Sequence, residues 1–114
     1  MRTRHGPTVE FGTTARATVA AMLGDRAPSV ERLAAAYGLS LRTMQRRLSE
    51  EGTSFSALLE DVRREQALER LAAGKGSLGA LSASLGYKRQ SALTRAVRRW
   101  TGRPPSRACR GDGD

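Results

Sequence analysis

The feature of this sequence that most constrains its fold is a short pattern that occurs twice. "YGLSLRTMQRRLS" places Gly38 directly before a basic segment, and "LGYKRQSALTRAVRRW" places Gly86 before another. Glycine adopts the left-handed conformation that ends many helices more readily than any other residue. Each copy is therefore predicted to form a helix, a tight turn and a second helix. The 114 residues are enough for one compact domain and too few for two independent ones.

The two basic segments align when their apolar residues are superimposed. Met44 then falls on Leu93 and Leu48 on Val97, and this register implies one extra residue after the second glycine. The polar residues between them recur at i, i+3, i+4 and i+7, which places them on one face of a helix. These residues are Arg42, Gln45, Arg46 and Ser49 in the first copy, and Ser91, Thr94, Arg95 and Arg98 in the second.

Residue types and spacing predict an all-α domain, because aromatic residues are scarce while Ala, Leu, Arg and Glu recur at helical intervals. The helix predicted after Gly38 is expected to turn Leu41, Met44 and Leu48 inward. We expect a flexible leader over residues 1–12, a domain over 13–110 and a disordered tail over 111–114. Within the domain, the first helix-turn-helix covers about 29–51, a linking helix about 54–73, the second helix-turn-helix about 77–101, and a last short helix starts at Pro105.

The net charge of +9 favours binding to a polyanion such as nucleic acid. The 20 basic residues comprise 18 arginines and 2 lysines, and the chain contains neither isoleucine nor asparagine. Part of the arginine excess is explained by a GC-rich genome, since lysine, isoleucine and asparagine use AT-rich codons. Only the placement of the arginines therefore argues for a function.

Several classes of function are disfavoured by the residues that are scarce. One cysteine, Cys109, and one histidine, His5, exclude a disulfide framework and a metal site with several Cys or His ligands. We expect no catalytic residues, no enzyme activity, no metal and no cofactor, because acids such as Glu50 and Asp61 fit solvated helix faces. No apolar run is long enough to span a membrane, and no secretory signal is recognisable. A cytoplasmic location without membrane attachment is the expectation.

The repeated pattern is typical of DNA-binding helix-turn-helix units, in which the turn presents the second helix to the major groove. Arginine matches the two acceptors of guanine, and glutamine matches adenine. A single helix with three arginines is more often a solvated surface, but two copies with matching polar faces favour DNA. The arginines of the linking helix, Arg63, Arg64 and Arg70, are expected to be solvated or paired with nearby acids.

The sequence resembles the DNA-binding domain of AraC/XylS-type transcription regulators. "SVERLAAAYGLSLRTMQRRLSEEGTSFSALLEDVRREQAL" is similar to the first half of that domain, and "SLGALSASLGYKRQSALTRAVRRWTGRPP" to the second. The resemblance implies seven helices forming two homeodomain-like units joined by a long helix. It also implies sequence-specific promoter binding to double-stranded DNA, usually with activation through RNA polymerase.

Site residues follow from the resemblance, position by position. It implies base contacts at Arg42, Gln45, Arg46, Gln90, Ser91, Thr94 and Arg95. Contacts with the DNA backbone are expected at Ser40, Thr43, Arg47, Lys88 and Arg98.

Three departures from the family pattern fall in the second half. Leu93 and Val97 stand where the family usually has phenylalanine, which predicts looser packing there. Ser82 stands where the family usually has alanine. The terminal aromatic residue of the pattern is replaced by Ala108 or Cys109.

The expected DNA site is asymmetric and bound by one molecule. A linking helix of about 19 residues is about 28 Å long, which is near the about 34 Å between successive major-groove segments on one side of DNA. Two alternatives stay open: a basic helical protein that binds RNA or anionic surfaces without sequence preference, and a protein-interaction module whose DNA contacts have decayed. The chain is also compatible with a short regulator, an excised domain or a remnant of a longer one.

Overall fold

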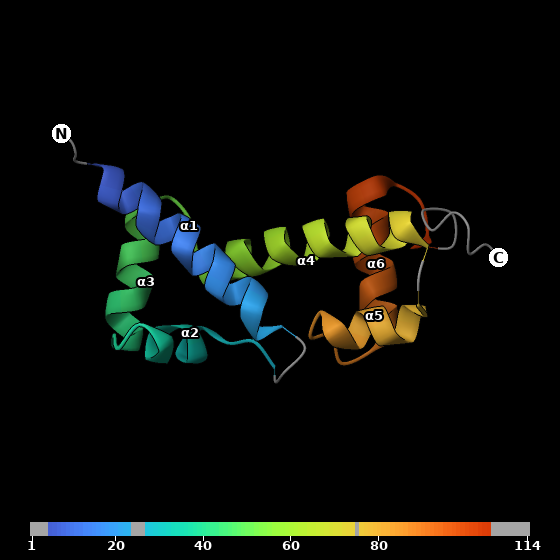
Figure 1. Ribbon diagram of the computed structural model, residues 1–114, viewed down its shortest axis with the longest axis horizontal. Coiled ribbons are helices and arrows are strands. Elements are labelled where there is room, and N and C mark those ends of the chain that lie inside the picture. Colours follow the sequence, from blue (N-terminus) through green and yellow to red (C-terminus); the bar gives the residue numbers. More distant parts are fainter. Residues whose placement is uncertain (1–4, 24–26, 75, 106–114) are drawn as a thin grey trace. The chain divides into compact units, whose positions relative to one another are not determined.

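The computed structural model describes residues 5–23, 27–74 and 76–105, and within them every regular element is an α-helix. The helices are α1 (His5–Met22), α2 (Val30–Ala36), α3 (Leu41–Glu50), α4 (Phe55–Ala73), α5 (Leu78–Ser84) and α6 (Gln90–Thr101) (Figure 1). The predicted all-α class is confirmed. Of the seventh helix, which was expected to start at Pro105, the structure describes only Pro105, which is helical, and the tail at 111–114 lies outside the described residues.

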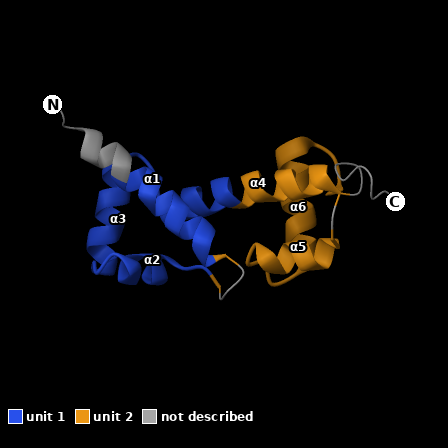
Figure 2. Cartoon of the chain, viewed as in Figure 1, with its two compact units in different colours: residues 1–22, 28–62 blue, residues 23–27, 63–114 orange. Residues whose placement is uncertain are grey.

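The chain divides into two compact units, each built around one helix-turn-helix pair (Figure 2). Unit 1 comprises residues 1–22 and 28–62, and unit 2 comprises residues 23–27 and 63–114. Helix α4 runs through the boundary and contributes its first part to unit 1 and its second part to unit 2. In unit 1, α2 packs on α3 and α1 packs on α2, whereas in unit 2, α5 packs on α6.

Unit 1 has a core drawn from all four of its helical segments. The buried residues are Phe11, Ala15, Val19 and Met22 from α1, Leu33 and Ala34 from α2, Met44 and Leu48 from α3, and Leu58 and Val62 from α4. Met44 and Leu48 face inward as predicted. The prediction for Leu41 is wrong, because this residue is 38% exposed. Leu41 is the first residue of α3, one turn before Met44, and the buried face of the helix begins only at Met44.

The N-terminus differs from the sequence-based expectation. Helix α1 begins at His5, within the segment 1–12 that was expected to be a flexible leader. Phe11 is only 8% exposed, and its ring meets the Tyr37 ring edge-on with 5.4 Å between centroids. Phe11, Ala15, Val19 and Met22 lie at i, i+4, i+8 and i+11, so the buried stripe of α1 begins before Gly12, inside the expected leader. The burial of Phe11 explains why the helix continues through this glycine.

Unit 2 is organised around a cluster formed by the second part of α4 together with α5 and α6. Ala67, Leu71, Leu81, Leu85, Leu93 and Val97 are buried in it, and Leu23, Leu78, Tyr87 and Trp100 pack against its edge. Leu93 and Val97 are both fully buried. The looser packing predicted from their size relative to phenylalanine stays a prediction. Their burial fixes which face of α6 is turned outward.

Candidate nucleic-acid interface

The turns of the two units have the same backbone hydrogen bonds at equivalent positions. The N–H groups of Gly38 and Leu39 donate to the carbonyls of Ala35 and Ala34, and those of Gly86 and Tyr87 donate to the carbonyls of Ala83 and Ser82. Both glycines are left-handed, with φ of +66° at Gly38 and +84° at Gly86. This bonding pattern is the Schellman motif, which ends a helix and turns the chain sharply. The repeat inferred from the sequence is thus present in the backbone.

The second helix of each pair starts in a different way. Ser40 caps α3, since its Oγ accepts a hydrogen bond from the Thr43 N–H at 3.1 Å. Arg89 precedes α6 and makes no side-chain capping bond. Instead the buried hydroxyl of Ser82 donates to the Arg89 carbonyl at 3.2 Å, which ties the end of the turn to α5. Ser82 therefore has a structural role that alanine could not perform.

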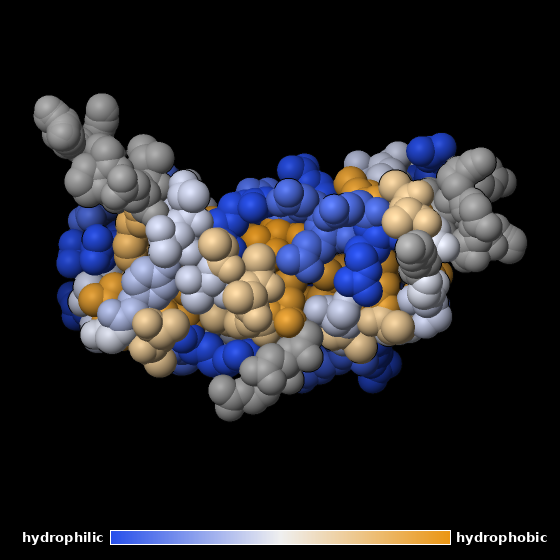
Figure 3. All heavy atoms as spheres, viewed as in Figure 1, coloured by the Kyte–Doolittle hydropathy of each residue, from blue (hydrophilic) through white to orange (hydrophobic). Residues whose placement is uncertain are grey.

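On α3, the polar stripe lies opposite the buried residues, as the helical period requires. Arg42, Gln45, Arg46 and Ser49 are all exposed, while Met44 and Leu48 are buried. Arg46 Nη1 lies 3.0 Å from Glu50 Oε2, one turn further along the same helix. The stripe thus presents two guanidinium groups, an amide and a hydroxyl to solvent. Hydrophilic residues are visible on the surface of both units in Figure 3.

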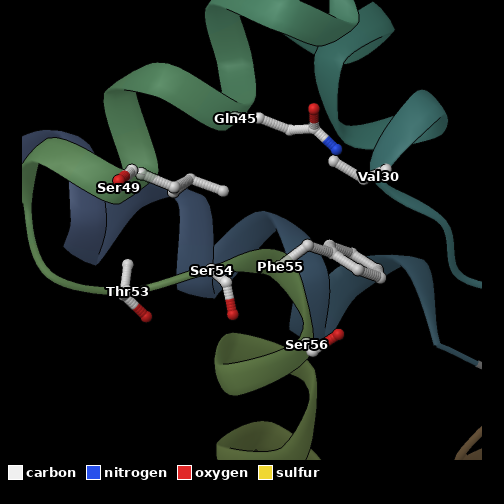
Figure 4. A pocket seen from close by; sticks show the side chains of 8 residues that line it. Val30, Gln45, Ser49, Thr53, Ser54, Phe55 and Ser56 are labelled. Carbon is white, nitrogen blue, oxygen red and sulfur yellow. The ribbon is translucent and has the colours of Figure 1, made fainter.

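Gln45 and Ser49 also border a hollow within unit 1. It has a volume of about 370 Å³ and is lined by Val30, Gln45, Leu48, Ser49, Thr53, Ser54, Phe55 and Ser56. Figure 4 shows the Gln45 side chain extending from α3 toward Val30 at the start of α2. Gln45 and Ser49 thus belong both to the exposed stripe and to the rim of the hollow.

On α6, the corresponding stripe is also turned outward. Gln90, Ser91, Arg95 and Arg98 are exposed and Thr94 is half-buried, whereas Leu93, Ala96 and Val97 form the buried face. A methyl group at Gly79 would lie 3.5 Å from Gln90 Oε1, so this side chain lies close to α5. The structure places both sets of predicted base-reading residues on the outer face of the second helix of a pair.

The residues expected to touch the DNA backbone occupy several environments. Lys88 and Arg98 are exposed. Ser40 and Thr43 are engaged with each other, because the Ser40 hydroxyl donates to Thr43 Oγ1 at 3.0 Å in addition to capping α3. Arg47 is exposed, but its guanidinium lies over the Phe11 ring at 4.2 Å from the centroid. The side chain of Arg47 is thus held against α1.

Glu51, which directly follows α3, is half-buried. Burial raises the pKa of its carboxyl above the usual value of 4.5, although the Gly12 backbone N–H and the charge of Arg47 act in the opposite direction. A Cβ at Gly12 would collide with Glu51 Oε1, so the carboxylate lies directly against α1. Phe11, Gly12, Arg47 and Glu51 form a contact between α1 and the end of α3 that the sequence alone did not indicate.

Arg63 on α4 was expected to be solvated or paired with an acid, and the structure shows main-chain partners that this expectation did not include. Its Nε donates to the Leu85 carbonyl at 2.8 Å, and its Nη2 donates to the Gly86 carbonyl at 3.1 Å. Its guanidinium also lies over the Tyr87 ring, 4.2 Å from the centroid. Position on the helix could not reveal these bonds, because both acceptors are main-chain atoms, 22 and 23 residues away.

No described helix is both long and apolar enough to cross a membrane. No group of three or more His, Cys, Asp or Glu residues that could hold a metal ion occurs among the described residues.

Comparison with known sequences points to one family. The sequence pattern of a helix-turn-helix domain family matches residues 33–110. Over 77 residues the chain is 43% identical to the HTH-type transcriptional regulator VirS of Mycobacterium tuberculosis, and over 79 residues it is 37% identical to the ornithine utilization regulator of Pseudomonas aeruginosa. These alignments cover 68% and 69% of this chain but 23% of each relative, so the chain spans about a quarter of their length.

Comparison with solved structures agrees with this. A DNA-binding transcriptional dual regulator from Escherichia coli K-12 matches with a TM-score of 0.74 and 26% identity, over 84% of this chain and 86% of that one. The transcriptional regulator CdpR from Pseudomonas aeruginosa matches with a TM-score of 0.68 and 32% identity, over 82% of this chain and 30% of that one. The C-terminal domain of AraT from Geobacillus stearothermophilus has the same fold, with a TM-score of 0.76 at 24% identity over 95% of this chain and 88% of that one. Since the family pattern covers more than half of the chain, and the turns and helices are those of the fold, this chain belongs to the AraC-type helix-turn-helix domain family.

Proposed function

We propose that this chain binds double-stranded DNA in a sequence-specific manner as the DNA-binding domain of a transcription regulator. The observation that carries the proposal is the pair of exposed polar stripes on α3 and α6. Each stripe follows a left-handed glycine turn with the same hydrogen bonds, and each lies opposite a buried apolar face. The names of the relatives, which describe transcriptional regulators, support the same conclusion.

In this proposal, α3 and α6 each enter a major-groove segment. On α3, Arg42, Gln45 and Arg46 read base edges, and on α6, Gln90, Ser91, Thr94 and Arg95 do so. Arginine suits guanine and glutamine suits adenine because each forms two hydrogen bonds with the base edge. Phosphate contacts come from Ser40, Thr43, Arg47, Lys88 and Arg98, and for Arg47 this requires the guanidinium to leave the Phe11 ring.

One chain reads two different half-sites, because the residues of the two stripes differ. The 19-residue α4, about 28 Å long, joins the units, and half-sites about one helical turn apart would suit it. Inserting about 5 bp between the half-sites turns one of them to the opposite side of the duplex. Simultaneous binding of both half-sites should then be lost.

A titration at two salt concentrations tests the proposal. Labelled duplexes, one carrying a site selected from a random pool and one of random sequence, are bound by the chain and followed by fluorescence anisotropy. Affinity for both should fall steeply as salt rises, because each phosphate neutralised by an arginine or lysine releases a counterion. The selected site should stay preferred at the higher salt concentration. Equal affinity for both duplexes, or for single-stranded RNA, would instead support a basic protein without sequence preference.

A further inference from the structure

Arg63 joins α4 to the turn that precedes α6, within unit 2. Its guanidinium makes two forked hydrogen bonds, from Nε to the Leu85 carbonyl at 2.8 Å and from Nη2 to the Gly86 carbonyl at 3.1 Å. The same group covers the Tyr87 ring at 4.2 Å. Three consecutive residues of the turn are thus held by one side chain from another helix.

The two acceptors are groups that the helix itself does not satisfy. The last carbonyls of a helix have no intrahelical donor, and Leu85 is the C-cap of α5. Gly86 follows in the left-handed conformation, with φ of +84°. A guanidinium presents its donors in a rigid planar fork and stacks on an aromatic ring, whereas an ammonium group is a compact point charge. The geometry at this turn therefore calls for arginine and not for positive charge alone.

The turn held by Arg63 determines where α6 begins. Only Lys88 and Arg89 separate Tyr87 from the first residue of α6, and Arg89 gives α6 no side-chain cap. The turn is also tied to α5 by the Tyr87 N–H bond to the Ser82 carbonyl at 3.1 Å and by the Ser82 hydroxyl bond to the Arg89 carbonyl at 3.2 Å. A change in the turn would consequently move the N-terminal end of α6, which carries Gln90 and Ser91.

The turn of unit 1 is supported by different contacts. Tyr37 meets the Phe11 ring edge-on, and the hydroxyls of Tyr37 and Thr18 share a hydrogen bond at 3.3 Å. These contacts come from α1, and Arg63 takes no part in them. Loss of the Arg63 contacts should therefore affect α6 and leave the presentation of α3 unchanged.

We propose that Arg63 is a positioning residue for base reading by α6. It does not contact DNA but fixes the turn that orients this helix, so that sequence preference at one of the two half-sites depends on it. The inference rests on the proposed function, since it concerns how one of the two reading helices is held.

The test uses the full chain and a DNA site that the wild-type chain selects from a random pool. The half-site read by α6 is identified as the one whose preference is relaxed by Arg95→Ala, and the half-site read by α3 as the one relaxed by Arg46→Ala. Binding is then measured to the intact duplex and to two duplexes in which either half-site is scrambled. The variants are Arg63→Lys and Arg63→Met, with Arg70→Lys and Arg70→Met as matched controls on an exposed position of the same helix.

The measured quantity is the ratio of affinities for the intact duplex and a duplex with one half-site scrambled, which we call discrimination at that half-site. In both Arg63 variants, discrimination at the α6 half-site should fall about tenfold or more, as for the loss of a well-formed base contact. Discrimination at the α3 half-site should be unchanged. The Arg70 variants should keep both. If Arg63→Met does not fold, as judged by circular dichroism, Arg63→Lys decides. Unchanged discrimination in Arg63→Lys, or an equal loss at both half-sites, would overturn the positioning role.

Amide hydrogen exchange supplies a readout that is independent of DNA. The Tyr87 N–H should exchange faster in Arg63→Lys than in the wild type, and Arg70→Lys should leave it unchanged. Equal protection in Arg63→Lys and the wild type would count against Arg63 holding the turn. Absence of any sequence preference in the wild-type chain would refute the proposed function instead, and the exchange rates would still decide whether Arg63 fixes the turn.

Discussion

Arg46 and Arg47 are neighbours on α3, but their guanidinium groups make different contacts that each would have to give up in order to bind DNA. Arg46 pairs with Glu50 at 3.0 Å, but both side chains are about 60% exposed. An exposed pair one helical turn apart contributes only about 0.3–0.5 kcal/mol, so DNA can displace Glu50 at small cost. Arg47 lies over the Phe11 ring, a contact worth about 0.5–1 kcal/mol at an exposed position. Arg46 is therefore the better candidate for reading a base.

Replacing Arg46 should separate base reading from general attraction. Arg46→Ala is expected to cost about 1–3 kcal/mol of binding free energy at the selected site and to relax the preference at one base pair. Arg70→Ala, which removes an exposed arginine from α4, should leave base preference unchanged. Both effects are measured by competition between single-base variants of the site. If the two substitutions weaken binding to all sequences equally, Arg46 contacts phosphate and not a base.

Ser82→Ala tests the hydroxyl that distinguishes this chain from the usual family pattern. Ser82 is 3% exposed and donates to the Arg89 carbonyl, which also accepts from the Ala92 N–H at 3.1 Å. Because the carbonyl keeps that second donor, the loss of unfolding free energy should be no more than about 1 kcal/mol. Urea unfolding measures it. If the free energy of unfolding falls by clearly more than one hydrogen bond contributes, the Ser82 hydroxyl also maintains the position of the turn.

At the level of helices, α1 contacts the end of α3 through Glu51 and Arg47. Helix α1 brings Gly12 against the Glu51 carboxylate and Phe11 against the guanidinium of Arg47. Burial raises the pKa of Glu51 despite the Gly12 N–H and Arg47, so the folded chain binds a proton at Glu51 more readily than the unfolded chain does. The stability that this residue contributes is therefore greatest below its usual pKa of 4.5 and is lost as pH rises through the higher value of the folded state.

The expected consequence is a pH-dependent difference between the wild type and Glu51→Gln. Glutamine carries no charge at any pH and can still accept a hydrogen bond from Gly12. The unfolding free energy of the wild type relative to the variant should fall as pH rises from about 4 to about 7. Urea unfolding at several pH values checks this. A difference that grows with pH would show that the Gly12 hydrogen bond and the charge of Arg47 outweigh burial, and a constant difference would show that these effects cancel.

Helix existence and helix caps could be predicted from the sequence because their causes are local. Ser29, Ser40 and Ser77 each accept a hydrogen bond from a backbone N–H three residues later, and a left-handed glycine follows the first helix of each pair as predicted. The start of α1 was missed because the burial of Phe11 depends on Tyr37, which lies beyond the next helix in the sequence. The role of Arg63 was missed because its acceptors are distant main-chain atoms, which leave no trace in the spacing of side chains.

For the whole molecule, the net charge of +9 favours attraction to DNA, and we propose that the two stripes read its sequence. Attraction alone does not distinguish one DNA sequence from another. Sequence information comes from contacts with base edges, which we assign to two different sets of residues. The central claim is therefore that one chain reads two unlike half-sites through α3 and α6.

Selection of binding sites from a random DNA pool tests this claim most directly, when it is carried out in parallel for the wild type, Arg46→Ala and Arg95→Ala. The wild type is expected to select an asymmetric site with two separate conserved blocks. Arg46→Ala should relax preference in one block only, and Arg95→Ala in the other only. A palindromic site, a single block, or relaxation of the same block by both variants would contradict the claim.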